Sequence, residues 1–540
     1  MPEKNIIRGR EPMMPLPQRS LGKLLLQSLI TRSRNYTAFV NAKTEENLSY
    51  GELLDSSLKL AISLKAYGLT SDKIIGIASD NHVKNFIIVL AALYTGIPIA
   101  FINPKFTKYE LQHILNIVTP EIIFCTTPYS SKLDDLKSQN AFLRKLIIVD
   151  SNEHTDGTDN LSNFVNQYYK PLQQLSSFQP VDVDIKEHIA FILFSSGTTG
   201  LPKGVMLTHL NVLATLVHSL DCFNIPKDCG VSLFVLPFFH TYGLHWILVA
   251  LLQGRTIVLL EKFEPEVYLS AIERYRISTL AAAPPLIHFL LKSDIVNRYN
   301  LTCVKDIACG GAPLTRDLEE AIKKKFNVPL VRQGFGMTEL GCAMAIPEGK
   351  ERLGSVGVLA PGVSCVVRDI NTSENLGPYQ RGEICIKGAI IMKGYYKNEK
   401  ATKEAFTQDG WMKTGDIAYY DEDGYFFIVD RIKELIKYKG FQIAPAELEQ
   451  ILLTNPKIQD AGVIGVPDED CGEIPLAFIV KQPSATLNEG EVKEHLAKFV
   501  SKNKYLYGGV RFIQEIPRTP SGKILRKELK KLLKPVPSKL

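Results

Sequence analysis

The sequence has little of what marks several protein classes. Its nine cysteines, among 540 residues, form no Cys-x-x-Cys pair and no cysteine–histidine ligand pattern, so neither a disulfide framework nor a structural zinc site is indicated. The formal net charge is only +6, and the composition therefore gives no reason to expect a nucleic-acid partner. We expect the thiols to be reduced and mostly buried, as in an intracellular protein.

No segment has the length and apolarity of a membrane span. The longest uncharged stretch, residues 86–103, contains Thr95-Gly96-Ile97-Pro98. A helix, a turn and a strand account for it better than a span of about 20 apolar residues. The first residues also lack the apolar core of a signal peptide. We therefore expect no stable membrane insertion.

Apolar segments alternate between strand-like and helix-like periodicity from residue 73 onward. Strands are predicted at residues 74–78, 97–102 and 122–125, with helices at residues 83–94 and 111–118 between them. The alternation returns with strands at 256–260 and 278–283 and helices at 265–274 and 286–291. A β-α-β-α-β order predicts a parallel sheet with helices on both faces. We therefore expect an α/β fold with two doubly wound units over most of residues 50–340.

The last third of the chain changes character. Residues 352–430 have short strand-like segments and many glycines, which predicts a small β-rich unit. An α+β segment follows, with a helix from Pro445, strands near 462–466 and 476–480, and a helix at 492–500. The final helix, residues 524–533, sets leucines against a basic face that we expect to be solvated, made of Arg526, Lys527, Lys530 and Lys531.

A segment rich in glycine and hydroxyl side chains follows an apolar strand predicted at residues 190–194. Residues 195–204 read S-S-G-T-T-G-L-P-K-G. The glycines let the backbone turn tightly and present its N–H groups, the hydroxyls add donors, and the lysine adds a positive charge, which together suit a polyphosphate. The pattern departs from the G-x-x-x-x-G-K-[ST] loop of the common NTPases, and a flexible surface turn is the alternative interpretation. The phosphate-binding candidates are Ser195, Ser196, Gly197, Thr198, Thr199, Gly200 and Lys203.

Six further segments follow in order: residues 310–313 (G-G-A-P), 333–339 (Q-G-F-G-M-T-E), 394–398, 411–416, 430–442 and 520–523 (P-S-G-K). Together with residues 195–204 they resemble the adenylate-forming superfamily, which includes acyl-CoA synthetases, plant coumarate-CoA ligases and beetle luciferases. The resemblance implies an N-terminal adenylation domain, residues 1–430, of two doubly wound sheet subdomains plus a β-barrel-like subdomain. It also implies a hinge at residues 431–437 that pivots at Lys433, and a small mobile α+β lid over residues 438–540.

The resemblance implies a chemistry as well. A carboxylate attacks the α-phosphorus of ATP to give an acyl-adenylate and pyrophosphate, and coenzyme A then accepts the acyl group as a thioester. This transfer depends on positioning and charge neutralisation more than on a protein nucleophile. By resemblance, the residues with nucleotide roles are Thr338 and Glu339 for phosphate and Mg²⁺, Gly311, Ala312 and Phe335 for adenine, and Asp416 with Arg431 for ribose. The alternatives are that Asp416 only shapes a turn and that Glu339 only caps a helix.

Two segments of the lid carry lysines that cannot approach one site together. In the superfamily, a lysine such as Lys523 reaches the oxygens that develop charge during adenylation. A segment such as that of Lys437, Gly440 and Gln442 serves the thioester-forming step, after the lid rotates about its hinge. The resemblance therefore implies that the lid works in two orientations.

His240, in the segment P-F-F-H-T-Y-G, matches the histidine at the mouth of the acyl pocket in these enzymes. A hydrogen-bonded core histidine is the alternative. The other residues of the pocket, by resemblance, are mostly apolar or small, which suits a hydrophobic aryl or fatty acid. They are Tyr242, Trp246, Cys309, Leu340, Gly341 and Cys342.

The acid pocket departs from the beetle luciferase pattern. Trp246 stands where these luciferases carry a small threonine, Cys342 where they carry serine, and Leu220 where they carry arginine. The tryptophan fills volume that a rigid benzothiazole would need, so the sequence favours an acyl- or aryl-CoA ligase. The alternatives are a luciferase that uses another luciferin and O₂, a carrier-protein ligase, and a nonenzymatic nucleotide- or lipid-binding protein.

The last three residues, Ser538-Lys539-Leu540, form a tripeptide that is read as a peroxisomal address. Pro535 and Pro537 precede it and favour an extended tail. We therefore expect a peroxisomal location, and the import receptor as a partner beside the small-molecule acid, ATP and CoA.

Overall fold

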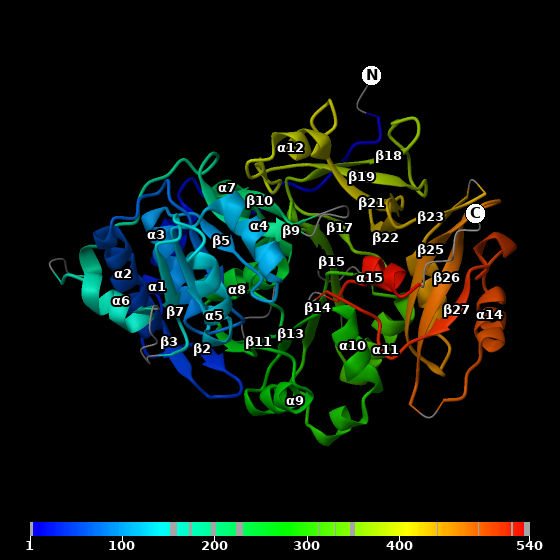
Figure 1. The fold of residues 1–540 in the computed structure, drawn as a ribbon, viewed down its shortest axis with the longest axis horizontal. Coiled ribbons are helices and arrows are strands. Elements are labelled where there is room, and N and C mark those ends of the chain that lie inside the picture. The colour runs from blue at the N-terminus through cyan, green and yellow to red at the C-terminus, as the bar shows by residue number, and fades with distance from the viewer. Residues whose placement is uncertain are drawn as a thin grey trace.

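Four sheets organise the part of the chain that the computed structural model describes (Figure 1). In Figure 1 the two large sheets with their helices occupy the left and the lower centre, a smaller β-rich unit lies above them, and the C-terminal sheet lies at the right. The described residues are 4–151, 159–171, 175–195, 201–222, 230–312, 314–329, 331–345, 352–439, 441–483, 485–519 and 522–533.

The first large sheet confirms the predicted β-α-β-α-β order. Its neighbouring strands are parallel from β9 to β8, whereas β10 pairs antiparallel with both β9 and β20. The connecting helices are α3 (Asn85–Thr95), α4 (Lys108–Val118) and α5 (Thr127–Lys137), and α6 (Leu161–Tyr168) follows β8. The strands, in spatial order, are β20 (Gly394–Tyr395), β10 (Lys203–Thr208), β9 (Ile189–Ser195), β5 (Ile99–Phe101), β4 (Ile75–Ala78), β6 (Ile122–Cys125), β7 (Lys145–Ile148) and β8 (Asp159–Asn160).

The second large sheet is parallel from β15 to β2 and ends in antiparallel strands at both edges. Its helices are α9 (Pro265–Arg274), α10 (Pro284–Lys292) and α11 (Arg316–Phe326). The strands, in spatial order, are β17 (Val358–Leu359), β16 (Gly341–Ala345), β15 (Val331–Met337), β14 (Asp306–Cys309), β13 (Thr279–Ala282), β11 (Val231–Phe234), β12 (Thr256–Leu259), β2 (Thr37–Asn41) and β3 (Asn47–Ser49).

Strand β2 was not expected in this sheet. It precedes the whole first unit in sequence, yet it pairs parallel with β12, with Phe39 opposite Ile257. The two units are therefore interleaved in the chain. Sequence periodicity could not show this, because a strand's partner depends on the tertiary fold rather than on its own residues.

A helical layer joins the two large sheets. It consists of α1 (Leu21–Ile30), α2 (Tyr50–Tyr67), α3, α7 (His209–Cys222) and α8 (Thr241–Gln253). Every residue of α3 is buried, as expected for a helix that is apolar on all sides. One core cluster includes residues of both sheets and of these helices, among them Ile77, Val89 and Ile257. The predicted helix and strand in residues 86–103 are confirmed as α3 and β5, and no described helix combines the length and apolarity that a membrane crossing requires.

The β-rich unit and the C-terminal unit each have their own sheet. Strand β22 ends at Arg431 and β23 begins at Ile436, while the domain limits themselves stay a prediction. The β-rich sheet contains β1 (Ile7–Arg8), β18 (Ser364–Arg368), β19 (Gly382–Lys387), β21 (Met412–Tyr420) and β22 (Phe426–Arg431), with helix α12 (Glu399–Ala405) nearby. The C-terminal unit contains β23 (Ile436–Tyr438), β24 (Phe441–Ile443), β25 (Ile458–Asp468), β26 (Gly472–Lys481), β27 (Gly509–Phe512), α13 (Pro445–Leu453), α14 (Glu489–Ala497) and α15 (Arg526–Lys531).

The prediction for the final helix was partly wrong. Helix α15 is shorter than residues 524–533, and Leu532 is 57% exposed. Arg526 does not lie on a solvated face, because its guanidinium donates to Glu434 at 2.6 Å and to both oxygens of Glu449 at 2.7 and 2.9 Å. Arg526 is at the first residue of α15, where the helix packs against β25, and this contact turns it inward. The cysteines agree with the prediction: those described are free and mostly buried.

We predict that Arg526→Met lowers the free energy of unfolding of the C-terminal unit by about 3–5 kcal/mol, since removal of one partner leaves buried carboxylates without a cation. Chemical denaturation of the full chain should show an earlier transition. Lys527→Met, at the exposed neighbouring position, is the matched control and should leave the transition unchanged. Equal transitions for both variants would contradict this account of Arg526.

Candidate active site

The predicted phosphate-binding segment connects two strands, β9 and β10, that pair antiparallel. Strand β9 ends at Ser195 and β10 begins at Lys203, and these two residues lie opposite each other in the antiparallel register. The Ser195 hydroxyl oxygen is buried and has no hydrogen-bond partner among the described residues. The Lys203 Nζ lies over the Tyr395 ring, 4.4 Å from its centroid. The remaining candidates, Ser196, Gly197, Thr198, Thr199 and Gly200, lie outside the described residues.

Glu339 is linked to Lys203, at the start of β10, through Tyr395. Its side chain is buried, and the Tyr395 hydroxyl donates to its Oε1 at 3.0 Å. Burial and the charge of Glu339 raise the pKa of Tyr395 above its ordinary value. Tyr395 therefore stays a neutral donor and joins Glu339 to Lys203. The sequence indicates Tyr395 only as one letter of a motif, and nothing in that motif predicts its role in the site.

The loop that carries Thr338 and Glu339 is held by close backbone packing. It joins β15 to β16, which pair antiparallel with an irregularity between Phe335 and Gly336. A Cβ on Gly336 would lie 2.1 Å from the Gly341 carbonyl oxygen, which no side chain can do. Glycine at position 336 therefore lets the two strands approach closely and fixes where Glu339 points.

Asp416 and Arg431 face each other across β21 and β22. The Arg431 Nε lies 3.2 Å from Asp416 Oδ1. Burial raises the pKa of the Asp416 carboxyl, against the opposing effect of Arg431 and Lys523. The second oxygen, Oδ2, is buried without a hydrogen-bond partner among the described residues. Such an unpartnered acceptor suits a donor brought by a ligand, as a ribose hydroxyl would be.

His240 occupies the N-cap position of α8, without a capping hydrogen bond from its side chain, and lines the smaller cavity together with Lys523. Burial, together with the charge of Lys523, lowers the pKa of His240 to about 4, so its imidazole is neutral near pH 7. Its Nε2 is buried and has no partner among the described residues. Burial, and then Arg431, lower the pKa of Lys523, while Asp416, Glu434 and Glu339 act in the opposite direction. The charge of Lys523 therefore interacts with all of these groups.

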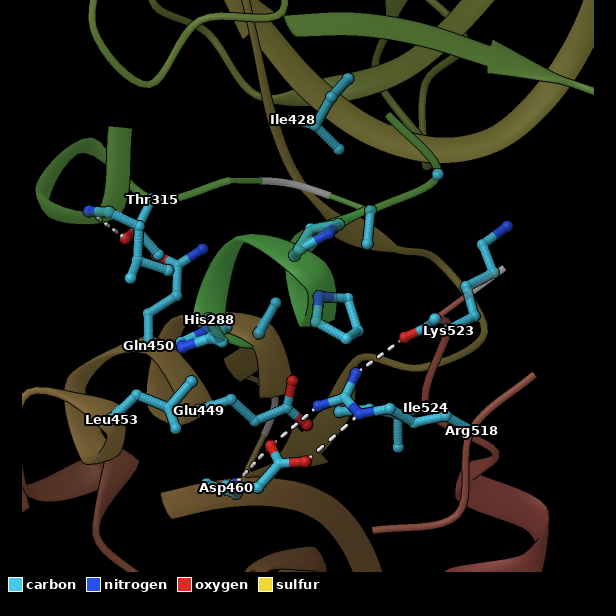
Figure 2. Close-up of a pocket in the computed structure, with 18 of the residues that line it drawn as sticks. His288, Thr315, Ile428, Glu449, Gln450, Leu453, Asp460, Arg518, Lys523 and Ile524 are labelled. Carbon is cyan, nitrogen blue, oxygen red and sulfur yellow. Dashed lines mark hydrogen bonds and ion pairs between the residues drawn. The ribbon is translucent and has the colours of Figure 1, made fainter. Parts of the chain in front are cut away.

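A short network in the lid fixes the loop of Lys523 (Figure 2). The Arg518 guanidinium donates to the Gly522 carbonyl oxygen at 2.7 Å and to Asp460 at 2.8 and 3.3 Å. The Thr519 backbone N–H donates to the Lys523 carbonyl oxygen at 2.7 Å, and the Lys523 N–H donates back to the Thr519 hydroxyl at 3.0 Å. Sequence reasoning missed Arg518, because a lone arginine before the P-S-G-K segment carries no pattern of its own.

Two cavities that share several lining residues bring most of the predicted residues together. A cavity of about 860 Å³ lies between α10 and the lid (Figure 2), and a second one measures about 550 Å³. Gly311, Phe335, Arg431 and Lys523 line both, and Ala312 and Asp416 line the larger one. The smaller one is also lined by Ser195, Lys203, His240, Tyr242, Trp246, Cys309, Thr338, Glu339, Gly341, Cys342 and Lys433. Leu340 is fully buried and lines neither.

The other lid segment lies away from both cavities. Lys437 and Gln442 are opposite each other on the antiparallel pair β23 and β24. The Lys437 side chain is exposed, and its backbone N–H donates to Glu473 Oε2 at 3.0 Å. Gly440, and the side chain of Gln442, lie outside the described part of the chain. The structure therefore brings Lys523, and not Lys437, to the site.

Two family models match the sequence: AMP-binding enzyme over residues 26–396, and AMP-binding enzyme C-terminal domain over residues 447–523. The chain belongs to the AMP-binding enzyme family. Luciferin 4-monooxygenase of Photuris pensylvanica is 42% identical over 100% of both chains. The 4-coumarate–CoA ligase-like 9 of Arabidopsis thaliana is 40% identical over 92% of this chain and 87% of its own. The solved structure of ATP-bound MatB from Rhodopseudomonas palustris covers 95% of this chain and 98% of its own, with 26% identity and a TM-score of 0.83.

These findings confirm the superfamily and the fold class predicted from sequence. This AMP-binding enzyme is ATP-dependent and adenylate-forming. Its relatives include enzymes named as luciferases and enzymes named as CoA ligases, so these relatives differ in the reaction for which they are named.

We predict that Gly336→Ala in this AMP-binding enzyme reduces ATP–pyrophosphate exchange by tenfold or more and destabilises the protein by about 1–3 kcal/mol. The added Cβ meets backbone, so the Glu339 loop must move. Gly377→Ala is the control, because the nearest atom to its Cβ, apart from its chain neighbours, is a glutamine side-chain oxygen at 3.7 Å. Full exchange activity in the Gly336 variant would contradict this account of the loop.

Proposed function

We propose that this enzyme is an acid–thiol ligase that activates a hydrophobic carboxylic acid as an acyl-adenylate and then forms its CoA thioester. The observation that carries the proposal is the position of Lys523, which lines the smaller cavity together with Glu339 and His240 and the larger cavity together with Asp416. Lys523 is the cation, Asp416 Oδ2 is a free acceptor, and His240 Nε2 is an uncharged group beside the acid. All three suit a reaction that couples a carboxylate to a nucleotide.

The chain's own groups support the adenylation step in a consistent way. Lys203 and the Ser195 hydroxyl lie where the β- and γ-phosphates would be held, and Asp416 with Arg431 would hold the ribose. Gly311, Ala312 and Phe335 would enclose the adenine. As the acid oxygen attacks the α-phosphorus and pyrophosphate leaves, Lys523 would neutralise the charge that develops on the reacting oxygens.

Glu339 is the residue that fits a magnesium ion. Among the described residues no cluster of three or more histidine, cysteine, aspartate or glutamate side chains forms a metal site. Magnesium is usually bound through one or two carboxylates plus substrate phosphates and water, and Glu339 lies at the phosphate side of the cavity with Thr338 beside it. When bound there, the ion would supply charge neutralisation for the phosphates.

The second step requires the lid to change its orientation. Lys437, Gly440 and Gln442 would serve thioester formation, and the hinge would pivot at Lys433, which lines the smaller cavity. Once pyrophosphate has left, rotation would remove Lys523 and admit the CoA thiol from another side. The thiol sulfur would attack the acyl carbon, and AMP would leave.

Trp246 favours the ligase over a luciferase. It is buried, and its ring meets that of Tyr242 edge-to-face at 6.5 Å between centroids. Together the two rings occupy the acid side of the cavity, where a rigid fused ring would have to lie. The luciferase relatives nevertheless make light emission the second candidate, with O₂ in place of the thiol after adenylation. For the tail, we propose that Ser538-Lys539-Leu540, which lies outside the described residues, directs import into peroxisomes.

One panel assay tests the function. AMP release is measured with medium- and long-chain fatty acids and with hydroxycinnamates, with and without CoA, while thioester product and light are recorded in the presence of O₂. A ligase releases AMP at a rate that CoA increases and accumulates thioester. Light with an insect lantern extract and no thioester would establish the luciferase instead. Absence of AMP release with every acid would overturn both.

We predict that Lys523→Ala lowers the adenylation rate by about 10²–10³-fold and largely spares thioester formation from preformed acyl-adenylate. Lys437→Ala should do the reverse, because its side chain lies outside the cavities in this lid orientation. ATP–pyrophosphate exchange and single-turnover thioester formation measure the two halves. Equal losses in both halves for Lys523→Ala would refute its assigned role.

A further inference from the structure

A hydrogen-bonded pair of polar side chains lies in the wall of the acid cavity. Ser219, near the end of α7, and His245, in the second turn of α8, both line the cavity of about 550 Å³. Their side chains meet at 2.6 Å between Ser219 Oγ and His245 Nε2. The described part of the chain gives neither side chain another hydrogen-bond partner. Neither residue belongs to a motif that the sequence singled out.

The pair keeps hydrogen-bonding capacity that it cannot satisfy by itself. A serine hydroxyl has one donor and two acceptor sites, and a neutral imidazole has one of each. Whichever imidazole nitrogen carries the proton, the single hydrogen bond between Ser219 and His245 leaves one donor and at least one acceptor of the pair unused. Burial, and the nearby His218, lower the pKa of His245 to about 3, so the imidazole is uncharged near pH 7. The pair therefore suits a neutral polar group rather than an anion.

The pair lies away from the reacting end of the acid. His240, which is influenced by the charge of Lys523, stands at the N-terminus of α8. His245 is five residues further along the helix, a rise of about 7.5 Å. Ser219 comes from α7, which packs against α8 and β16 inside the N-terminal part of the fold. Tyr242 and Trp246 lie on the same stretch of α8 as His245 and supply the aromatic walls.

We propose that Ser219 and His245 recognise, by hydrogen bonding, a hydroxyl group at the end of the substrate opposite its carboxylate. The preferred substrate is then a hydrophobic acid that ends in a hydroxyl group. The inference rests on the proposed function and narrows its substrate class. An acid with a plain hydrocarbon end would cover the pair and leave a donor and an acceptor unpaired, which a site built around hydrogen bonds discriminates against strongly. A terminal hydroxyl can accept from the free donor and donate to the free acceptor.

The test compares acids that differ only by the hydroxyl. Dodecanoate is paired with 12-hydroxydodecanoate, and cinnamate with 4-hydroxycinnamate, so that an aliphatic and an aryl end are both examined. We expect kcat/KM for AMP release to be at least tenfold higher for the hydroxylated member of one pair. If the aliphatic acids show the preference, the substrate has an aliphatic tail; if the cinnamates show it, the substrate has an aryl tail. Similar kcat/KM values within both pairs would overturn the inference.

Two variants show whether Ser219 and His245 cause the preference. Ser219→Ala and His245→Phe should each reduce the ratio towards one, mainly by lowering kcat/KM of the hydroxylated acid. Activity with the plain acid reports that each variant is folded and still forms adenylate. Ser57→Ala is the matched control, a buried serine of α2 whose hydroxyl donates to the Leu54 carbonyl oxygen at 2.9 Å, and it should keep the wild-type ratio.

The outcomes separate the two levels of the proposal. A preference that persists in both variants would assign the recognition to other residues and overturn the role of the pair. Absence of AMP release with all four acids and with the broader panel would instead refute the proposed function. Higher activity with the plain acids, together with a gain on Ser219→Ala, would show that the pair opposes rather than recognises a polar end.

Discussion

The site depends on one constraint: a lid lysine must be brought into a cavity where a charge is costly. Burial lowers the pKa of Lys523, and Arg431 adds to the effect. The compensation comes from Asp416, Glu434 and Glu339, which belong to different parts of the fold. A cation that is poorly solvated and incompletely paired stabilises developing negative charge strongly, because little solvent has to reorganise as the charge appears. Each element around Lys523 can be understood as holding one of these groups in place.

The fold meets this constraint by bringing strand ends and strand connections from several sheets together around Lys523. The β9–β10 pair supplies Lys203, the β15–β16 connection supplies Glu339, and the β21–β22 pair supplies Asp416 and Arg431. The first two sheets are locked to each other by the buried α3 and its neighbours, so these groups have fixed relative positions. The lid is fixed differently, through the Arg518 network at the base of the lysine loop. The proposed movement of Lys523 requires both features: a rigid set of partner groups on one side, and a separately folded unit that carries the lysine on the other.

The sequence was sufficient wherever the signal is local. Apolar periodicity located the strands and helices from β4 to β6, and the ordered motifs located the residues that now line the cavities. It failed where the partner is distant in sequence. Arg526 was expected in water because its neighbours are lysines, yet Glu449 lies 77 residues away and receives it. In the same way, the residues of β2 predict a strand but not its pairing with β12. Ser219 and His245 are 26 residues apart and belong to no sequence motif that would predict their contact.

The placement of the two lid lysines has an electrostatic reason in the proposed reaction cycle. Lys523 already shares the cavity with Arg431, which disfavours its charge. A second lysine in the same low-dielectric space would increase that repulsion. The phosphates of ATP would balance Lys523 during adenylation, and the loss of pyrophosphate removes much of that negative charge. The charge of Lys523 would then be less well balanced within the cavity. In the proposed cycle, the departure of pyrophosphate thus destabilises the lid orientation that places Lys523 in the cavity. It thereby favours the second orientation, in which the β23–β24 hairpin that carries Lys437 takes the place of Lys523.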